Sequence, residues 1–202
     1  MAHTDQLERA LQESIANRIA QSAPRLTGII PSGPGYRTEL SESFAVFQLD
    51  EKELKRSDNM ESSVKDTKSW YHQITSSMAG APGAPLMQPR IVGYARSETQ
   101  SPNQQRLLAV GEVKPGFDLP NLIRKTAEWI DKNVTADPIV RLVVIPERYM
   151  HCFWLKYDDH DNVVVIDMPT KYKYLSTFKI YDLPTFKALL EKEAPITPLP
   201  PR

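Results

Sequence analysis

Glu112 and Lys114 are the two residues of this chain whose types and spacing best suit chemistry. They end the apolar run 107–114, which predicts a strand, and residues two apart on a strand point to the same face. A carboxylate there is a ligand for Mg²⁺, and a lysine beside it can orient an attacking water or balance the charge of a scissile phosphate. The pair indicates either metal-assisted hydrolysis of a phosphodiester or a solvated ion pair on an open strand.

The motif Glu112-Val113-Lys114 resembles the E-x-K motif of the PD-(D/E)XK nuclease-like superfamily. The resemblance extends over residues 90–145, in which two strands, a helix and a further strand follow one another. It implies a restriction-endonuclease-like core, a Mg²⁺ cofactor and another acidic ligand on the strand before the motif.

That further acid is missing from its expected place. A hairpin centred on its polar loop sets Glu112 opposite Val92 and Lys114 opposite Arg90, so a cation rather than a carboxylate faces the motif. The resemblance then implies Glu13, on the first helix, as the second metal ligand. With one acid absent, a nuclease-like fold without cleavage is favoured over an active metal site.

Composition predicts a cytoplasmic protein without a membrane partner. Lysine plus arginine and aspartate plus glutamate number 25 each, so the net charge is zero and gives no support to nucleic-acid binding, although a local basic face is compatible with it. Cys152 is the single cysteine, and its apolar neighbours predict a buried, inert thiol. Neither a signal peptide nor a run of about 20 apolar residues is visible.

The spacing of hydrophobic residues, charges and glycine with proline predicts five segments in the first half of the chain. Leucine and isoleucine at every fourth position predict a helix from Asp5 to Gln21. Phe44–Leu49 predicts a strand, and mixed charges predict a solvated helix or exposed turn over Asp50–Ser63. Val64–Met78 is predicted to continue as a helix, and glycine with proline predicts a flexible loop near 79–85.

The second half predicts a βαβ unit. The strands Arg90–Ser97 and Leu107–Lys114 form a hairpin, a helix covers 121–133, and the continuous apolar run Ile139–Ile145 is typical of a strand covered on both faces. We expect Leu107–Lys114 and Ile139–Ile145 to be parallel neighbours with a right-handed crossover. Further predicted elements are a hairpin of Tyr149–Tyr157 with Val163–Met168 and a last helix, Leu183–Lys192.

Two polar segments offer other interpretations. Lys171, Tyr172, Lys173 and Tyr174 alternate cations with aromatic rings, a pattern that can follow phosphates and stack bases in nucleic-acid binding. The same alternation is typical of a strand with tyrosines inward and lysines outward, which we favour. The run Asp158–Asn162 holds metal-capable side chains but lacks the glycine of an EF-hand loop, so it predicts a hairpin turn.

The sequence therefore predicts one α/β domain over residues 1–193, with a mixed central sheet flanked by helices, and a proline-rich tail at 194–202. The favoured function is a non-catalytic module that binds another protein or a second copy of itself through the first helix, the segment 50–63 and the tail. The alternative is a Mg²⁺-dependent phosphodiesterase acting on nucleic acid through Glu112 and Lys114. Only this alternative requires a cofactor.

Overall fold

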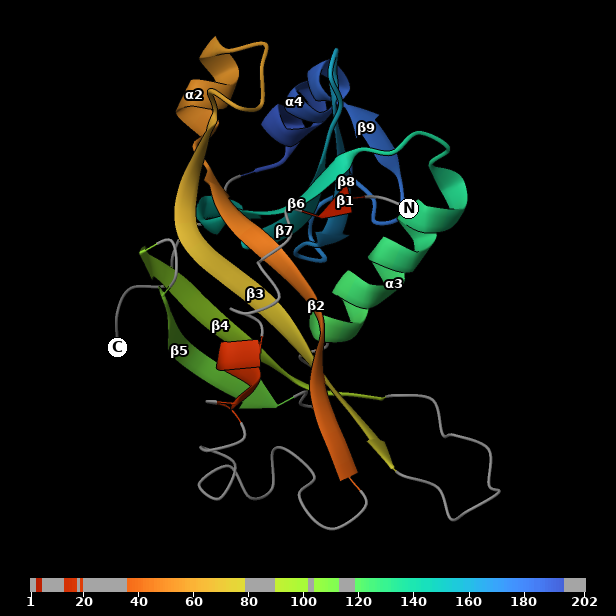
Figure 1. The fold of residues 1–202 in the computed structure, drawn as a ribbon. Helices are drawn as coiled ribbons and strands as arrows, with labels where there is room; N and C mark the ends of the chain where they lie inside the picture. The colour runs from red at the N-terminus through yellow and green to blue at the C-terminus, as the bar shows by residue number, and fades with distance from the viewer. Residues whose placement is uncertain are drawn as a thin grey trace, which may run out of the picture. The chain divides into compact units, whose positions relative to one another are not determined.

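The structure is a computed structural model with a mixed α/β fold (Figure 1). It describes residues 3–4, 13–17, 19, 36–78, 90–101, 104–112 and 119–194. The chain divides into two compact units that are interleaved along the sequence. Unit 1 comprises Met1–Asp5, Val46–Thr67 and Leu122–Arg202, and unit 2 comprises Gln6–Ala45 and Lys68–Asn121.

Unit 2 contains a sheet in which the strands lie side by side in the order β5-β4-β3-β2 (Figure 1). β3 pairs with β4, and β4 pairs with β5, in both cases antiparallel. β2 and β3 each continue from unit 2 into unit 1. The bounds are β2 (Tyr36–Leu49), β3 (Val64–Met78), β4 (Arg90–Ser101) and β5 (Gln104–Glu112).

The strand β3 corrects the predicted helix over Val64–Met78. Its residues pair with β4 from Ser69 to Ser76, and six consecutive residues, 71–76, are buried. Burial on both faces removes the apolar–polar alternation by which a strand is usually recognised. The segment is nevertheless rich in aromatic and β-branched residues such as Trp70, Tyr71 and Thr75, which favour a pleated strand.

The register of β4 and β5 differs by one residue from the expected one. Glu112 pairs with Gly93, not with Val92, because the register shifts between Arg96 and Ser97. A bulge places one extra residue on β5 at Leu108, since Arg96 pairs with Ala109 and Ser97 with Leu107.

Part of the predicted first helix is described. Residues 13–17 and residue 19 are helical, and Ile15 and Ile19 are buried against Ile74 and Ala95 of unit 2. These apolar side chains recur every four residues, which places them on one helix face. The loop at 79–85 and the tail beyond residue 194 lie outside the described residues.

Unit 1 contains a mixed set of strands centred on β6. β6 runs parallel to the end of β2 and to β1, and antiparallel to β7. β8 follows β7 antiparallel, and β9 follows β8 in the same way. The predicted strand Ile139–Ile145 and the predicted hairpin of Tyr149–Tyr157 with Val163–Met168 are confirmed. The bounds are β1 (His3–Thr4), β6 (Ile139–Ile145), β7 (Met150–Lys156), β8 (Asp161–Asp167) and β9 (Ile180–Asp182).

The expected pairing of Leu107–Lys114 with Ile139–Ile145 is wrong. β6 pairs with β2, where Val46 lies opposite Leu142, and with β7 on its other side. β5 is hydrogen-bonded to β4, and no other described strand pairs with it. The helix after β5 therefore returns the chain to the first long strand of the sheet instead of to its own neighbour.

Two of the described helices begin at an aspartate that caps them. Asp50 accepts hydrogen bonds from two backbone N–H groups at the start of α2 (Glu51–Arg56), and Asp182 does the same for one at the start of α4 (Leu183–Lys192). α3 (Leu119–Asn133) confirms the predicted helix, as α4 does. None of the described helices is long and apolar enough to cross a membrane.

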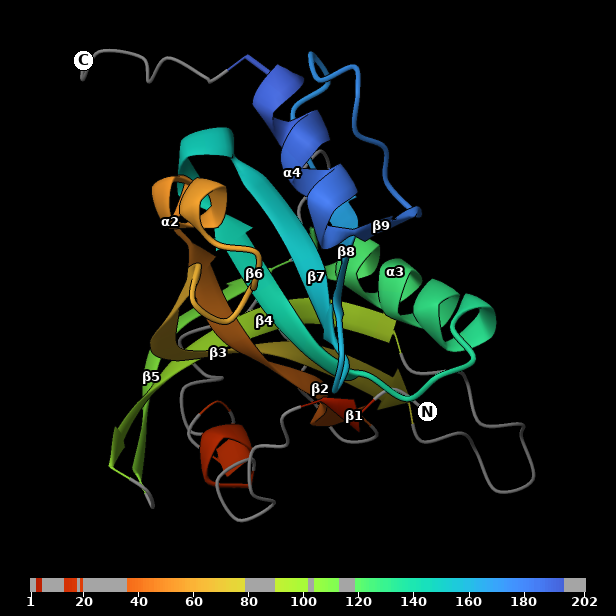
Figure 2. The same cartoon turned by 90° about the horizontal axis from the view of Figure 1, so that it is seen from above.

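One apolar core in unit 1 lies between strands and helices. Leu54 of α2 and Met60 of the following turn are buried in it, so the segment 50–63 is partly core rather than wholly solvated. α4 packs against β8 and β9, as Figure 2 shows. Cys152 on β7 is buried, which confirms the predicted burial, and burial raises the pKa of its thiol.

Candidate binding site

The predicted catalytic pair lies at the edge of the described part of the chain, so its assembly into a site stays a prediction. Glu112 is the last residue of β5, Lys114 lies outside the described residues, and Glu13 is exposed on the helical segment. Among the residues that the structure describes, no three histidine, cysteine, aspartate or glutamate side chains gather to hold a metal ion. The described chain therefore offers no metal centre from which to argue catalysis.

Unit 1 has a polar cleft of about 340 Å³ between three segments. It lies where the turn after α2, the β7–β8 turn and the start of α4 meet. Carboxylates dominate its lining, and they come from Asp58, Glu61, Asp158, Asp159, Asp161 and Asp182. We call it the acidic cleft.

Several of these carboxylates have structural roles. Asp161 accepts a hydrogen bond from Trp154 Nε1 at 2.7 Å and another from the backbone N–H of Met60 at 3.1 Å. Glu61 accepts hydrogen bonds from Lys156 Nζ at 2.8 and 2.9 Å, and this lysine lowers the pKa of the Glu61 carboxyl. These contacts join the turn after α2 to β7 and β8, which accounts for the charge without a catalytic role.

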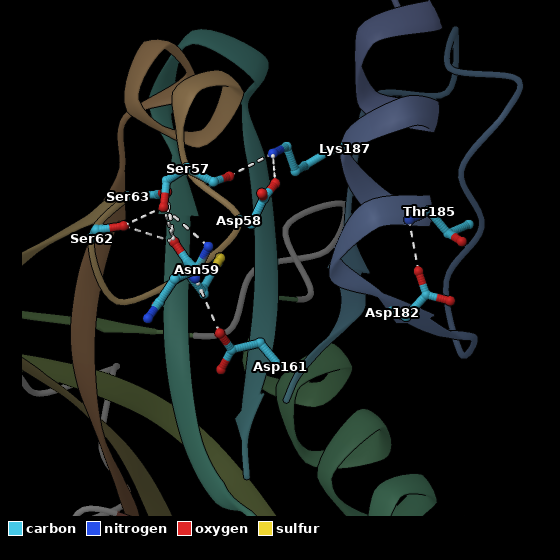
Figure 3. Close-up of polar contacts among 10 residues, drawn as sticks. Ser57, Asp58, Asn59, Ser62, Ser63, Asp161, Asp182, Thr185 and Lys187 are labelled. Atoms are coloured by element: carbon cyan, nitrogen blue, oxygen red, sulfur yellow. Dashed lines mark hydrogen bonds and ion pairs between the residues drawn. The ribbon is translucent and has the colours of Figure 1, made fainter. Parts of the chain in front are cut away.

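Polar groups beside the acidic cleft also hold segments together (Figure 3). Lys187 Nζ on α4 donates to the carbonyl of Ser57 at 2.5 Å and to Asp58 at 3.3 Å. The carbonyl of Asn59 accepts hydrogen bonds of 3.0 Å from three serine hydroxyl groups of the same turn, on Ser57, Ser62 and Ser63. Hydrogen bonds thus join the segments around the acidic cleft, and its carboxylates do not form an open set of metal ligands.

The segment Asp158–Asn162 is the hairpin turn that the sequence predicts, with its last two residues in β8. The backbone N–H of Tyr157 donates to the carbonyl of His160 at 3.0 Å, which closes the turn. The rings of these two residues stack with centroids 4.3 Å apart, and His160 Nδ1 lies 2.6 Å from a carboxylate oxygen of Asp159. That hydrogen bond lowers the pKa of Asp159.

A second groove of unit 1 carries the opposite charge. It has a volume of about 430 Å³ and is lined by the end of β2, the first residues of α2, the start of β3 and the short 3-10 helix η2 (Pro146–Arg148). Lys52, Lys55 and Lys65 lie around it with exposed side chains. None of the three lysines has an ion-pair partner among the described residues. We call it the lysine groove.

The acidic residues of the lysine groove are largely committed to other partners. Arg148 is only 4 % exposed and makes a two-pronged ion pair with Glu51, with N–O distances of 2.6 and 2.7 Å. This hydrogen-bonded carboxylate raises the pKa of Arg148. Asp50 caps α2 by accepting from the backbone N–H of Lys52 at 2.8 Å. Glu147 is the one remaining acid in the lining, so the lysines leave a positive excess.

Tyr149 follows Arg148 directly and is the most exposed large apolar or aromatic side chain of the described residues, at 56 %. Its backbone has a φ of 49°, in the left-handed region that favours glycine. A tyrosine in this conformation carries a conformational cost, and such outliers cluster at functional sites. Sequence patterns did not single out Arg148 or Tyr149, because neither belongs to a periodic segment or a recognised motif.

The segment Lys171–Tyr174 is an irregular loop, so the favoured strand interpretation is wrong. Tyr172 is buried, whereas Lys171, Lys173 and Tyr174 are exposed. The loop is held by one carboxylate oxygen of Glu193, which accepts the backbone N–H groups of three successive residues, Lys173, Tyr174 and Leu175, at 2.8, 2.5 and 3.1 Å. The role of this loop in nucleic-acid binding stays a prediction.

Unit 2 contains a buried chain of hydrogen bonds around His72. Ser43 Oγ lies 2.8 Å from His72 Nδ1, and His72 Nε2 lies 2.8 Å from Ser97 Oγ. Ser97 Oγ donates to Gln105 Oε1 at 3.1 Å, and Gln105 Nε2 donates to Thr99. A serine beside a histidine is a nucleophile pair in many hydrolases. Here both serines and the histidine are buried, which favours a structural role.

Comparison of the chain with models of known protein families, with curated proteins and with solved structures gives no match. Function must therefore be argued from the geometry of the described residues.

Proposed function

We propose that the protein is a non-catalytic protein-interaction module and that the lysine groove of unit 1 contacts its partner. The observation that carries this proposal is the contrast between two sets of charged groups. Most of the aspartates and glutamates that line the two surfaces are tied to backbone and side-chain partners, whereas Lys52, Lys55 and Lys65 form no ion pair with any described acid. Uncompensated exposed charge around a concave surface favours recognition of a partner. A cytoplasmic location is part of the same proposal.

The alternative function, a Mg²⁺-dependent phosphodiesterase, depends on Glu112 and Lys114. The relationship to the PD-(D/E)XK superfamily belongs to this alternative, since the interaction module does not require it. The chemistry needs several oxygen ligands around the cation, and the described residue paired with Glu112 is Gly93, which has no side chain to offer.

Isothermal titration of the full chain with Mn²⁺ tests the proposal, together with hydrolysis assays on DNA and RNA. We expect no saturable binding and no hydrolysis. Saturable binding that disappears in Glu112→Gln, with hydrolysis lost in the same variant and reduced in Lys114→Ala, would overturn the proposal in favour of the phosphodiesterase. Glu98→Gln is a matched control, because it removes a carboxylate near the other end of the same hairpin.

A further inference from the structure

We infer that the ligand of the lysine groove is an acidic, extended segment of a partner protein. The inference rests on the proposed function, because it names the chemistry of the partner that the groove would recognise. It is carried by the size of the groove, by the sign of its uncompensated charge and by the charge of the surface next to it.

The groove is of the size that takes a few side chains. Its volume of about 430 Å³ falls within the range of roughly 300 to 1,000 Å³ that is typical of sites for compact ligands. The three lysines come from two elements, with Lys52 and Lys55 on α2 and Lys65 on β3. Cations on separate elements can reach carboxylates on successive positions of an extended peptide.

The uncompensated charge of the groove is positive and concentrated on flexible side chains. The charge of Arg148 is already neutralised by Glu51. Arg148 therefore shapes the groove but does not bind a new anion. Without a ligand, the lysine side chains stay hydrated and free to rotate. They therefore suit carboxylates spread along a peptide better than one planar, bidentate anion.

The neighbouring acidic cleft argues against a nucleic acid in the same place. The segment 50–63 contributes to both surfaces, with its first residues in the lysine groove and Asp58 and Glu61 in the acidic cleft. Evenly spaced phosphates that ran beyond the groove would meet carboxylates, and like charges repel. A peptide can confine its negative charge to the few residues that occupy the groove.

Tyr149 supplies the aromatic contact that such interfaces favour. It is not itself a lining residue, but it directly follows Arg148, which is, and it is largely exposed. Tyrosine is enriched among residues whose truncation strongly weakens protein binding. A ring retained in a left-handed backbone conformation that glycine would adopt without strain fits a contact residue better than a packing residue.

Fluorescence anisotropy of the full chain with a labelled peptide of about ten residues, alternating glutamate and serine, tests the inference. We expect saturable binding that weakens as salt is raised from about 0.05 to about 0.5 M, because the contacts are exposed ion pairs. Lys52→Gln/Lys65→Gln should weaken binding at least about tenfold, and Lys52→Arg/Lys65→Arg should retain it. Lys125→Gln/Lys132→Gln on α3 removes the same charge outside the groove and should have no effect.

Tyr149→Gly separates a contact role from a structural one. Relief of the left-handed strain should raise the midpoint of urea unfolding, while loss of the ring should weaken peptide binding. Absent binding of the acidic peptide, equal weakening in the α3 variant, or equally tight binding of a glutamine–serine peptide would each overturn the inference. An oligodeoxythymidylate of equal charge that bound more tightly through the same two lysines would replace it with a nucleic-acid ligand. None of these outcomes depends on Mn²⁺, so they are distinct from failure of the proposed function.

Discussion

His72 is the residue whose surroundings have the clearest energetic consequence. Its imidazole lies between the hydroxyl groups of Ser43 and Ser97, and burial lowers its pKa to about 4. Because the Ser97 hydroxyl donates to Gln105, it must accept from His72 Nε2, and Nδ1 is then the acceptor for Ser43. The neutral ring is therefore matched to its partners at both nitrogens, and a proton on Nδ1 would break this match.

The free energy of unfolding should accordingly decrease as the pH is lowered, because His72 resists protonation only in the folded chain. The pKa is about 6.5 in an unfolded chain and about 4 in the fold, so the contribution is complete above pH 6.5 and is lost as the pH falls from there through 4. The full loss amounts to about 3 kcal/mol. The variant His72→Gln, which does not titrate, should lose less free energy of unfolding between about pH 7 and about pH 4.5 than the unsubstituted chain.

Urea unfolding followed by circular dichroism at the two pH values measures that difference. His160→Gln is the control, because His160 is exposed in the β7–β8 turn and is not enclosed by hydroxyl groups. The same pH dependence in the His72 variant and in the unsubstituted chain would contradict the assignment.

Gly111 is the second residue at which the structure predicts the effect of a substitution on stability. It lies opposite Tyr94 across β4 and β5, and a Cβ at Gly111 would lie 2.5 Å from atoms of the Tyr94 ring. Alanine usually stabilises a strand relative to glycine by about 0.5 to 1 kcal/mol. Here Gly111→Ala should instead destabilise by about 1 to 3 kcal/mol, because the ring must move from its stack on Tyr71.

A double-mutant cycle with Tyr94→Leu, measured by urea unfolding, checks this cause. Without the ring, the cost of Gly111→Ala should shrink or change sign. An unchanged cost in the Tyr94→Leu background would show that the backbone of Gly111, and not the neighbouring ring, is responsible.

At the scale of elements, the loop at Lys171–Tyr174 depends on the end of α4. One carboxylate oxygen of Glu193 accepts three successive backbone N–H groups, and the Glu193 carbonyl accepts a hydrogen bond from Arg148. The side chain of Glu193 is buried, so water cannot easily replace it. Three successive backbone N–H groups of an irregular loop are thereby satisfied by a single side chain.

Glu193→Ala should destabilise the protein by about 2 to 3 kcal/mol, because it leaves buried N–H groups without an acceptor. The loss should be local as well, and hydrogen exchange at the amides of Lys173, Tyr174 and Leu175 should accelerate. Glu193→Gln keeps an amide oxygen and should cost less. Glu191→Ala, at an exposed position of the same helix, should change neither measurement; equal protection of the three amides in Glu193→Ala would refute the role of this carboxylate.

The elements differ in how well the sequence predicted them, and burial explains the difference. β6, α3 and α4 were predicted because their apolar residues are continuous or recur at helical spacing. β3 was not, because polar side chains such as His72 and Gln73 fill its buried positions and are satisfied by hydrogen bonds. Such satisfaction depends on partners from distant strands, which local spacing does not reveal.

The candidate site was less accessible to prediction than the fold. The E-x-K spacing drew attention to Glu112 and Lys114, whereas the lysine groove collects residues 48–52, 55, 65 and 147–148 from separate segments. No motif links these positions in sequence, and Lys52 and Lys55 resemble the ordinary charges of a solvated helix. Only the folded chain shows that Arg148 is neutralised and that the lysines are not.

On the scale of the whole molecule, the two units share two strands. β2 passes from unit 2 to unit 1 between Ala45 and Val46, and β3 passes from unit 1 to unit 2 between Thr67 and Lys68. Neither unit is a continuous piece of chain, so loss of one would break strands that the other requires. We expect cooperative unfolding of both units.

Trp154 fluorescence in a Trp70→Phe/Trp129→Phe background reports on unit 1 alone. The substitution Gly111→Ala in unit 2 should shift the urea midpoint seen at Trp154 by the same amount as the midpoint seen by circular dichroism. An unmoved Trp154 midpoint, or a biphasic circular dichroism curve, would show that the units unfold independently.

Because Cys152 is buried, its rate of labelling reports how often the unit 1 core opens. It is the sole cysteine of the sequence, and it is enclosed on β7 with a raised thiol pKa. A thiol reagent such as Ellman's reagent can react with it only after the surrounding core has separated. At high reagent concentration the labelling rate then equals the opening rate, without any engineered probe. A cysteine introduced on the surface would label far faster, so attachment of a dye there needs no prior removal of the native thiol.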